Sequence, residues 1–229
     1  MGSEDLFEPL RRQLISEVAA QLAVLGAQLN CRMLSERVMH AMQRVPRHEF
    51  VPVKVKPFAY MNTPLPIGCG KTISQPFIVA LMTELLALDP GHRVLEIGTG
   101  LGYQATILAE LVREVYSVEL IPELSAAASK RLARLGYRNI HLRVGNGRLG
   151  WPEHAPFDRI VVTTAPDLIP PALLQQLKPG GKMMIPTGIP DRQQLVLVER
   201  DANGRTTTRE ILAVRFSEME EDSGPGGTS

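Results

Sequence analysis

The chain has 229 residues, of which 44% are hydrophobic, and it carries 25 basic and 24 acidic side chains. This length suits one large α/β domain, and the apolar fraction is enough for a packed core. The formal net charge of +1 leaves no overall excess that would attract nucleic acid or an anionic membrane.

The cysteines and the N-terminus indicate a cytoplasmic protein. Cys31 and Cys69 lie far apart and form no metal-ligand spacing, so we expect two free thiols in a reducing compartment. Acidic residues stand near the N-terminus, where a secretory signal would carry basic ones, and no apolar run reaches membrane-spanning length.

Two helices are predicted at the start of the chain. Apolar residues recur at helical spacing over residues 6–29, and a second helix is expected over residues 35–45, with Ser35 as its N-cap. Residues 46–70 differ in kind, because five prolines exclude long regular elements. A segment of this length without regular structure is uncommon in a compact domain unless it is functional.

A strand, a glycine loop and a helix follow one another in the centre of the chain. Residues 94–97 form a short apolar run, after which glycines occupy alternate positions at Gly98, Gly100 and Gly102. Helical spacing then predicts a helix over residues 103–113. Such a glycine turn at a helix N-terminus cradles nucleotide-like ligands. The glycines alone fit both NAD and S-adenosylmethionine.

The rest of the chain alternates strand and helix patterns. Further helices are predicted over residues 76–88, 122–135 and 170–177, with Gly136 as the stop of the second of them. Further strands are predicted over residues 115–119, 140–144, 157–163 and 182–186, and an antiparallel hairpin over residues 194–200 and 205–214.

This order predicts an α/β fold with a doubly wound, mostly parallel sheet, an N-terminal helical cap and a C-terminal antiparallel hairpin. We expect a single domain over residues 1–229. Residues 1–70 hold the N-terminal helices and the proline-rich segment, and residues 71–216 form the ligand-binding core. Residues 217–229 are acidic and then rich in glycine, which predicts a disordered tail.

The carboxyl ends of the predicted strands collect polar residues at one edge of the sheet, where ligands of such folds bind. These ends carry the glycine loop, Glu119, Asn146 and the pair Thr163–Thr164. A carboxylate at the position of Glu119 takes ribose hydroxyls in either kind of nucleotide site. Asn146 stands between two glycines, and it either pairs with an adenine edge or forms an ordinary turn.

Ser74 has no evident catalytic base. Its spacing predicts a helix cap, because Pro76 suits the first turn of the helix that follows. No Gly-x-Ser-x-Gly elbow surrounds Ser74, and the five histidines are scattered singly. Neither a hydrolytic triad nor a metal site is therefore expected.

Several segments together resemble the protein-L-isoaspartate O-methyltransferase family. The most specific is Thr72-Ile-Ser-Gln-Pro76, which precedes the glycine loop in the chain. The others are Val115-Tyr-Ser-Val-Glu119, Gly145-Asn-Gly147, Ala155-Pro-Phe-Asp158, Val162-Thr-Thr-Ala-Pro166 and Ala213-Val-Arg-Phe216. The resemblance covers residues 38–216, most of the chain.

The resemblance implies a Rossmann-like class I methyltransferase that uses S-adenosyl-L-methionine, releases S-adenosyl-L-homocysteine and needs no metal. Its substrates would be damaged proteins and peptides, methylated on the free carboxyl of L-isoaspartyl residues, and the ester would collapse to a succinimide. A monomer without nucleic-acid or membrane partners is expected.

The resemblance also implies roles for individual residues. Ser74 is expected in the active site as the catalytic residue. Substrate contacts are expected from Thr72, Ile73, Gln75, Thr163 and Thr164. Cofactor contacts are expected from Glu96, Gly98, Thr99, Gly100, Gly102, Glu119, Asn146 and Gly147.

Three positions depart from the family pattern. Asn146 replaces the aspartate of the usual Gly-Asp-Gly, although an amide oxygen can still accept from an adenine amino group. Residues 217–219 are Ser-Glu-Met in place of Val-Pro-Leu, and Cys69 stands where a polar residue such as glutamine is usual. Two alternatives stay open: a related carboxylate methyltransferase with one dedicated peptide or small-molecule substrate, and a module that binds S-adenosylmethionine or NAD without catalysis.

Overall fold

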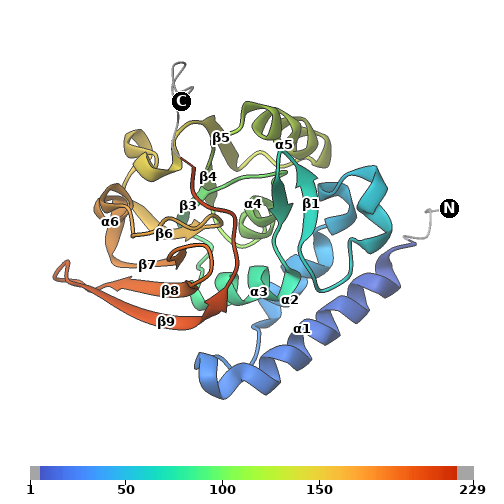
Figure 1. Ribbon diagram of the computed structural model, residues 1–229, viewed down its shortest axis with the longest axis horizontal. Coiled ribbons are helices and arrows are strands. Elements are labelled where there is room, and N and C mark those ends of the chain that lie inside the picture. Colours follow the sequence, from blue (N-terminus) through green and yellow to red (C-terminus); the bar gives the residue numbers. More distant parts are fainter. Residues whose placement is uncertain (1–5, 221–229) are drawn as a thin grey trace.

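The computed structural model describes residues 6–220, and seven strands form its main sheet in the order β5-β4-β3-β6-β7-β8-β9 (Figure 1). Five strands run parallel: β3 (Arg93–Ile97), β4 (Glu114–Glu119), β5 (Ile140–Val144), β6 (Phe157–Val162) and β7 (Leu177–Thr187). β8 (Gln193–Arg200) pairs antiparallel with both β7 and β9 (Thr206–Val214). The predicted doubly wound sheet with a closing hairpin is confirmed.

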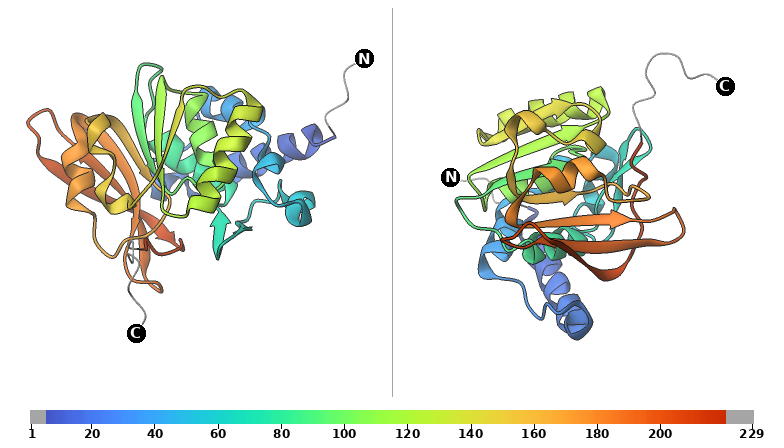
Figure 2. Two further views of the ribbon diagram at one scale, coloured as in Figure 1. Left: turned by 90° about the horizontal axis from the view of Figure 1, so that it is seen from above. Right: turned by 90° about the vertical axis from the view of Figure 1, so that its left-hand side faces the viewer.

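Helices cover both faces of this sheet, as the two side views in Figure 2 show. Successive strand residues point to opposite faces, so Val94 belongs to one hydrophobic cluster and Leu95 to the other. The Val94 cluster takes residues from α1 (Glu8–Leu29), α2 (Glu36–Arg44), α3 (Pro76–Leu85), α4 (Tyr103–Ala109) and α5 (Pro122–Leu135). The Leu95 cluster packs against α6 (Pro171–Gln176).

The helix ends follow local chemistry. Ser35 caps α2 by accepting from the Val38 amide, and Gly136 ends α5 in the left-handed conformation, both as predicted. The predicted ends of α3 and α4 were wrong by three and four residues: α3 ends at Leu85 instead of residue 88, and α4 at Ala109 instead of residue 113. Ala87 takes a positive φ of 49°, which an α-helix cannot continue.

The proline-rich segment contains only short elements, as predicted. Two 3₁₀ helices, η1 (Arg47–Phe50) and η2 (Val53–Phe58), precede a small antiparallel hairpin of β1 (Leu65–Gly68) and β2 (Lys71–Ile73). Ile67, Thr72 and Ile73 of this hairpin line one hollow together with Gly98 and Gly100 of the glycine loop. The segment therefore forms a wall next to the predicted site.

The chain after β9 is ordered for longer than predicted. The Ala165 amide donates to the Ser217 carbonyl at 2.8 Å, and the Met219 amide donates to the Ala165 carbonyl at 2.9 Å. Met219 is buried, so the expectation that the disordered tail begins at residue 217 was wrong. The remainder of the expected tail, residues 221–229, lies outside the described residues. Within residues 6–220, no helix has the length and apolar character needed to cross a membrane.

Candidate active site

The glycine loop joins β3 to α4 and approaches the end of β6. Gly98 has a φ of +95°, and a Cβ atom there would lie 2.4 Å from Oγ1 of Thr163. Only glycine fits this combination of positive φ and close approach. The Thr163 hydroxyl donates to the Gly98 carbonyl at 2.8 Å, which fixes the loop against the end of the neighbouring strand.

Glu119 ends β4 and faces the loop, as predicted. Its Oε2 accepts from the Gly100 amide at 2.7 Å, and its Oε1 accepts from the Ile121 amide at 3.0 Å. Each carboxylate oxygen has a second lone pair. Glu119 also lines a cavity together with Gly147 and Thr164, so the carboxylate is positioned to accept from ligand hydroxyls.

Glu96 lies beneath the loop rather than in the cavity. The residue is fully buried, and its Oε2 accepts from the Ser117 hydroxyl, which in turn lies 2.5 Å from Oγ1 of Thr99. Burial raises the pKa of the Glu96 carboxyl to about 8; the hydrogen bond from Ser117 opposes this shift, and the nearby Glu119 charge adds to it. The hydrogen bonds from Glu96 through Ser117 to Thr99 thus connect the glycine loop to the buried ends of β3 and β4.

The sequence left two roles open for Asn146, a turn or pairing with an adenine, and the structure shows the turn. Its Oδ1 accepts from the Arg148 amide at 2.9 Å and so caps the 3₁₀ helix η3 (Gly147–Leu149). Pairing of Asn146 with an adenine stays a prediction. A Cβ atom at Gly147 would lie 2.4 Å from Cγ2 of Ile97, so the backbone at Gly147 passes close to the end of β3.

Ser74 lies between β2 and α3, and its predicted role as helix cap was wrong. The N-cap position is Gln75, whose side chain makes no capping bond, and Pro76 is the first helical residue. The Phe77 amide instead donates to Oδ1 of Asn62 at 3.0 Å. Because Asn62 performs the capping from a distant segment, the Ser74 hydroxyl is left for another use.

Two hollows meet at Ser74. The larger has a volume of about 480 Å³ and is bounded by α1, by Ser74 and Gln75, by the end of β9 and by the segment that follows it. The smaller is bounded by the glycine loop and by Thr72, Ile73 and Ser74. Thr72, Ser74 and Thr163 line both hollows, so the two hollows adjoin at these residues.

Thr164 contributes a hydroxyl that lacks a partner. Its Oγ1 is buried and has no hydrogen-bond partner among the described residues, and the residue lines the part of the site that also contains Glu119. A buried, unpaired hydroxyl in a protein interior usually has a functional reason. This atom is a candidate for a polar ligand group.

Several site residues were not predicted from the sequence. Gln21 and Leu25 of α1 line the larger hollow, although the helix looked like a structural cap. Lys71 forms an ion pair with Glu220 and, with Glu218, Met219 and Glu220, borders the cavity beside Glu119. No local sequence signal identifies these residues, because their partners are distant in the chain.

The chain that forms this site has known relatives. A sequence profile described as protein-L-isoaspartate(D-aspartate) O-methyltransferase (PCMT) matches residues 21–223. The chain belongs to this family. The resemblance noted from the sequence motifs is thereby confirmed.

Individual protein-L-isoaspartate O-methyltransferases support the assignment. Protein-L-isoaspartate O-methyltransferase 1 of Polaromonas sp. (strain JS666) is 58% identical over 224 residues, which cover 98% of this chain and 94% of the relative. A solved protein-L-isoaspartate O-methyltransferase matches at a TM-score of 0.77 and 29% identity, covering 92% of this chain and 67% of its own. A Plasmodium falciparum structure in complex with S-adenosyl-L-homocysteine shares the fold, with a TM-score of 0.77 at 22% identity and coverage of 92% and 98% of the two chains.

Proposed function

We propose that the protein is a carboxyl O-methyltransferase that transfers a methyl group from S-adenosyl-L-methionine to the free carboxyl of L-isoaspartyl residues in damaged proteins and peptides. The observation that carries the proposal is the position of Ser74, a hydroxyl with no capping duty at the junction of the two hollows. Family membership supports the reaction, and the junction supplies the place where two reactants would meet.

The smaller hollow and the cavity beside Glu119 have residues that suit S-adenosyl-L-methionine. This cofactor supplies a methyl group on a positively charged sulfur. The glycine loop lets the ligand approach the backbone closely. Glu119 can accept from ribose hydroxyls, and the unpaired Thr164 hydroxyl gains a partner when the site is filled. Lys71 and Glu220, which form an ion pair, line the cavity that also contains Glu119 and Thr164.

The proposed chemistry asks little of acid–base groups. A peptide carboxyl with an ordinary pKa of about 4 is ionised at neutral pH, so no base is needed to activate it. The Ser74 hydroxyl can donate to one carboxylate oxygen while the other takes the methyl group. Positioning of two reactants in this way lowers a barrier by roughly 7–11 kcal/mol.

The larger hollow fits the peptide that carries the carboxyl. Its lining is partly apolar, with Leu25, Ile78 and Leu212, and it also includes Arg215. A side chain next to the isoaspartyl residue has room here. The ester formed would then lie beside the peptide backbone, where cyclisation to a succinimide is a spontaneous reaction that follows release.

The test is methyl transfer to two peptides of the same sequence, one with L-isoaspartyl and one with L-aspartyl at the same site. The proposal predicts methylation of the isoaspartyl peptide only. Transfer to both peptides, or to neither, would reject it. If neither is methylated, a melting experiment separates the alternatives, because a ligand at 100 times its Kd stabilises a protein by about 2.7 kcal/mol. Stabilisation by S-adenosylhomocysteine then indicates a dedicated substrate or a binding module, and stabilisation by NAD indicates a dinucleotide site.

We also propose that the protein acts as a cytoplasmic monomer without nucleic-acid or membrane partners. The net charge of +1 supports the absence of polyanionic partners. Sedimentation velocity at several concentrations tests the monomer, and a concentration-dependent sedimentation coefficient would contradict it.

A further inference from the structure

Arg47 begins η1 and is completely buried. Arginine is almost never fully buried unless it is paired, yet no ion pair joins Arg47 to a carboxylate among the described residues 6–220. Its Nη1 has no hydrogen-bond partner there. Burial lowers the pKa of Arg47, while the neighbouring phenol of Tyr103 acts in the opposite direction. So costly a placement calls for a specific reason.

The contacts of Arg47 connect the walls of the site. Its Nε donates to the Ala59 carbonyl at 2.9 Å, in the proline-rich segment. Its Nη2 donates to the Ser74 carbonyl at 2.8 Å. The guanidinium also lies over the ring of Tyr103, 4.8 Å from the centroid, and Tyr103 is the first residue of the helix behind the glycine loop. One side chain thus contacts the substrate segment and the cofactor segment.

The bond to the Ser74 carbonyl determines where the next amide points. The Ser74–Gln75 peptide bond is trans, since the described residues contain one cis peptide bond, at Ala155–Pro156. In a trans peptide the C=O and the N–H point in opposite directions. With the Ser74 carbonyl directed toward Arg47, the Gln75 N–H points away from Arg47, and both Ser74 and Gln75 line the larger hollow. No described residue accepts a hydrogen bond from this N–H.

We propose that Arg47 is a positioning residue, which holds the Ser74–Gln75 peptide so that the Gln75 N–H and the Ser74 hydroxyl together bind the substrate carboxylate. The inference rests on the proposed function. Arg47 touches neither reactant. It acts by fixing the orientation of the Ser74–Gln75 peptide, and its hydrogen bond to the Ala59 carbonyl ties that peptide to the proline-rich segment.

The first test compares Arg47→Lys with Arg159→Lys. Arg159 is a matched control, because it also donates to backbone carbonyls, those of Leu86 and Ala87, but it pairs with Val94 near the start of β3, away from the glycine loop at the other end of that strand. Both variants should melt at a lower temperature than the wild type. At a temperature where both are folded, Arg47→Lys should lower kcat/KM for the isoaspartyl peptide about tenfold or more, mainly through a higher KM, since a hydrogen bond to a charged group is worth at least that factor.

Three readouts decide the outcome. Affinity for S-adenosylhomocysteine should stay within about twofold in both variants, as should the kcat/KM of Arg159→Lys; differences below this are under ~0.4 kcal/mol. If Arg47→Lys melts earlier but keeps the wild-type kcat/KM, Arg47 is only a structural tie and the inference is overturned. A wild-type enzyme that methylates no isoaspartyl peptide rejects the proposed function and the inference with it.

A second pair of variants tests the amide directly, and it serves even if Arg47→Lys does not fold. Gln75 has a φ of −54°, which proline can adopt, so Gln75→Pro removes the N–H at little conformational cost. Gln75→Ala is the control, because both variants lose the bond from Nε2 of Gln75 to the Asn62 carbonyl. We expect Gln75→Pro to raise KM about tenfold above Gln75→Ala. Equal KM values in the two variants would overturn the inference.

Discussion

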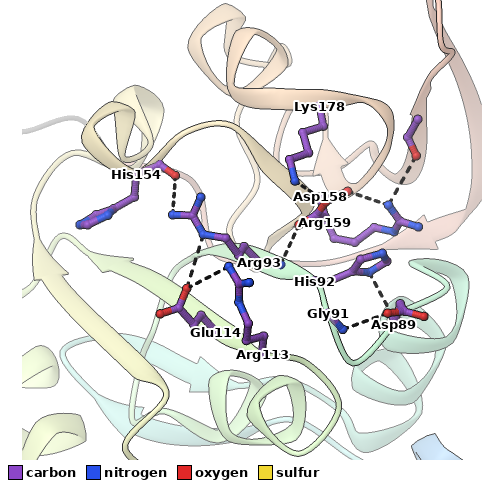
Figure 3. Close-up of polar contacts among 11 residues, drawn as sticks. Asp89, Gly91, His92, Arg93, Arg113, Glu114, His154, Asp158, Arg159 and Lys178 are labelled. Carbon is purple, nitrogen blue, oxygen red and sulfur yellow. Dashed lines mark hydrogen bonds and ion pairs between the residues drawn. The ribbon is translucent and has the colours of Figure 1, made fainter.

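The two ends of the parallel strands differ in how completely their polar groups are paired. At the N-terminal ends the charged side chains are paired within the protein: Asp158 accepts from Nζ of Lys178 at 2.7 Å and from the Arg93 amide at 2.8 Å (Figure 3). At the C-terminal ends, Oγ1 of Thr164 and Oε1 of Gln104 are buried without partners among the described residues. Both ends are polar, but within residues 6–220 these buried, unpaired side-chain atoms lie at the C-terminal ends.

Unpaired buried groups cost stability, so their concentration at one end indicates that selection there acts on binding rather than on folding. The same end contains the loop glycines with positive φ and the buried Glu96 with its raised pKa. The paired end contributes ordinary stability. Substitutions at the two ends should therefore have separable effects, on activity at one and on melting temperature at the other.

The largest effect is expected at Ser74. Ser74→Ala should lower kcat about 100-fold, the usual loss when one preorganised donor is removed, while the affinity for S-adenosylhomocysteine stays nearly constant. Steady-state kinetics and calorimetry measure the two quantities. Ser35→Ala is the control, because it removes a serine that caps α2 and should cost stability without changing kcat. Equal losses of kcat and cofactor affinity at Ser74 would contradict the assigned role.

The next largest effect is expected at Gly98. Gly98→Ala places a Cβ atom 2.4 Å from Oγ1 of Thr163 and strains a backbone with φ of +95°. It should cost about 1–3 kcal/mol of stability and weaken S-adenosylhomocysteine binding. Gly136→Ala has a similar φ of +84° but open space around it, so it should show the strain alone, with normal ligand binding. Titration calorimetry of both variants checks this, and intact binding in Gly98→Ala would speak against the loop as the cofactor site.

Glu96 gives a prediction about pH. Its folded-state pKa of about 8 lies above the ordinary 4.5, so between these values the folded protein holds a proton that the unfolded chain releases. This contribution is absent at low pH and destabilises increasingly as the pH rises through this window. Glu96→Gln cannot titrate, so its unfolding free energy relative to wild type should improve between pH 6 and pH 7, by at most about 1.4 kcal/mol. Urea denaturation at both pH values measures the difference, and a pH-independent difference would show that Glu96 is ionised in the fold.

The smallest effect is expected at the paired end. Burial alone would raise the pKa of Asp158, but Lys178 and the Arg93 amide outweigh it and hold the pKa below its ordinary value. The resulting stability is present above the ordinary pKa and is lost as the pH falls through the folded value. Asp158→Asn should therefore lower stability at neutral pH by about 1 kcal/mol and leave kcat unchanged. If Asp158→Asn lowers kcat under conditions where both it and the wild type are fully folded, the two ends do not have separate effects on activity and stability.

Much of the fold followed from local signals in the sequence. Apolar runs located the parallel strands, and β5 was predicted with its observed bounds, residues 140–144. Ser35 and Gly136 were recognised because caps depend on neighbouring residues alone. The β7 strand was predicted too short, since Leu177–Thr187 begins with a proline–glycine stretch that pairs only through an irregular register with β6.

The site was less predictable, because its decisive contacts are not local. Ser74 was expected to cap a helix, but Asn62, twelve residues earlier, takes that role. Arg47 was not singled out from the sequence, and its buried guanidinium donates to the carbonyls of Ala59 and Ser74. The order of residues 217–220 likewise depends on Ala165. The partners are twelve or more residues apart, and no periodic pattern or capping motif links them.

Amide hydrogen exchange with and without S-adenosylhomocysteine tests the difference between the two ends most directly. The ligand should slow exchange in the glycine loop, residues 98–102, and in the segment over it, residues 163–165 and 217–220. Exchange in the turn at residues 89–93 and at residues 178–182, both at the paired end, should not change. Protection that appears at the paired end, or that is absent from the glycine loop, would contradict the placement of the active site.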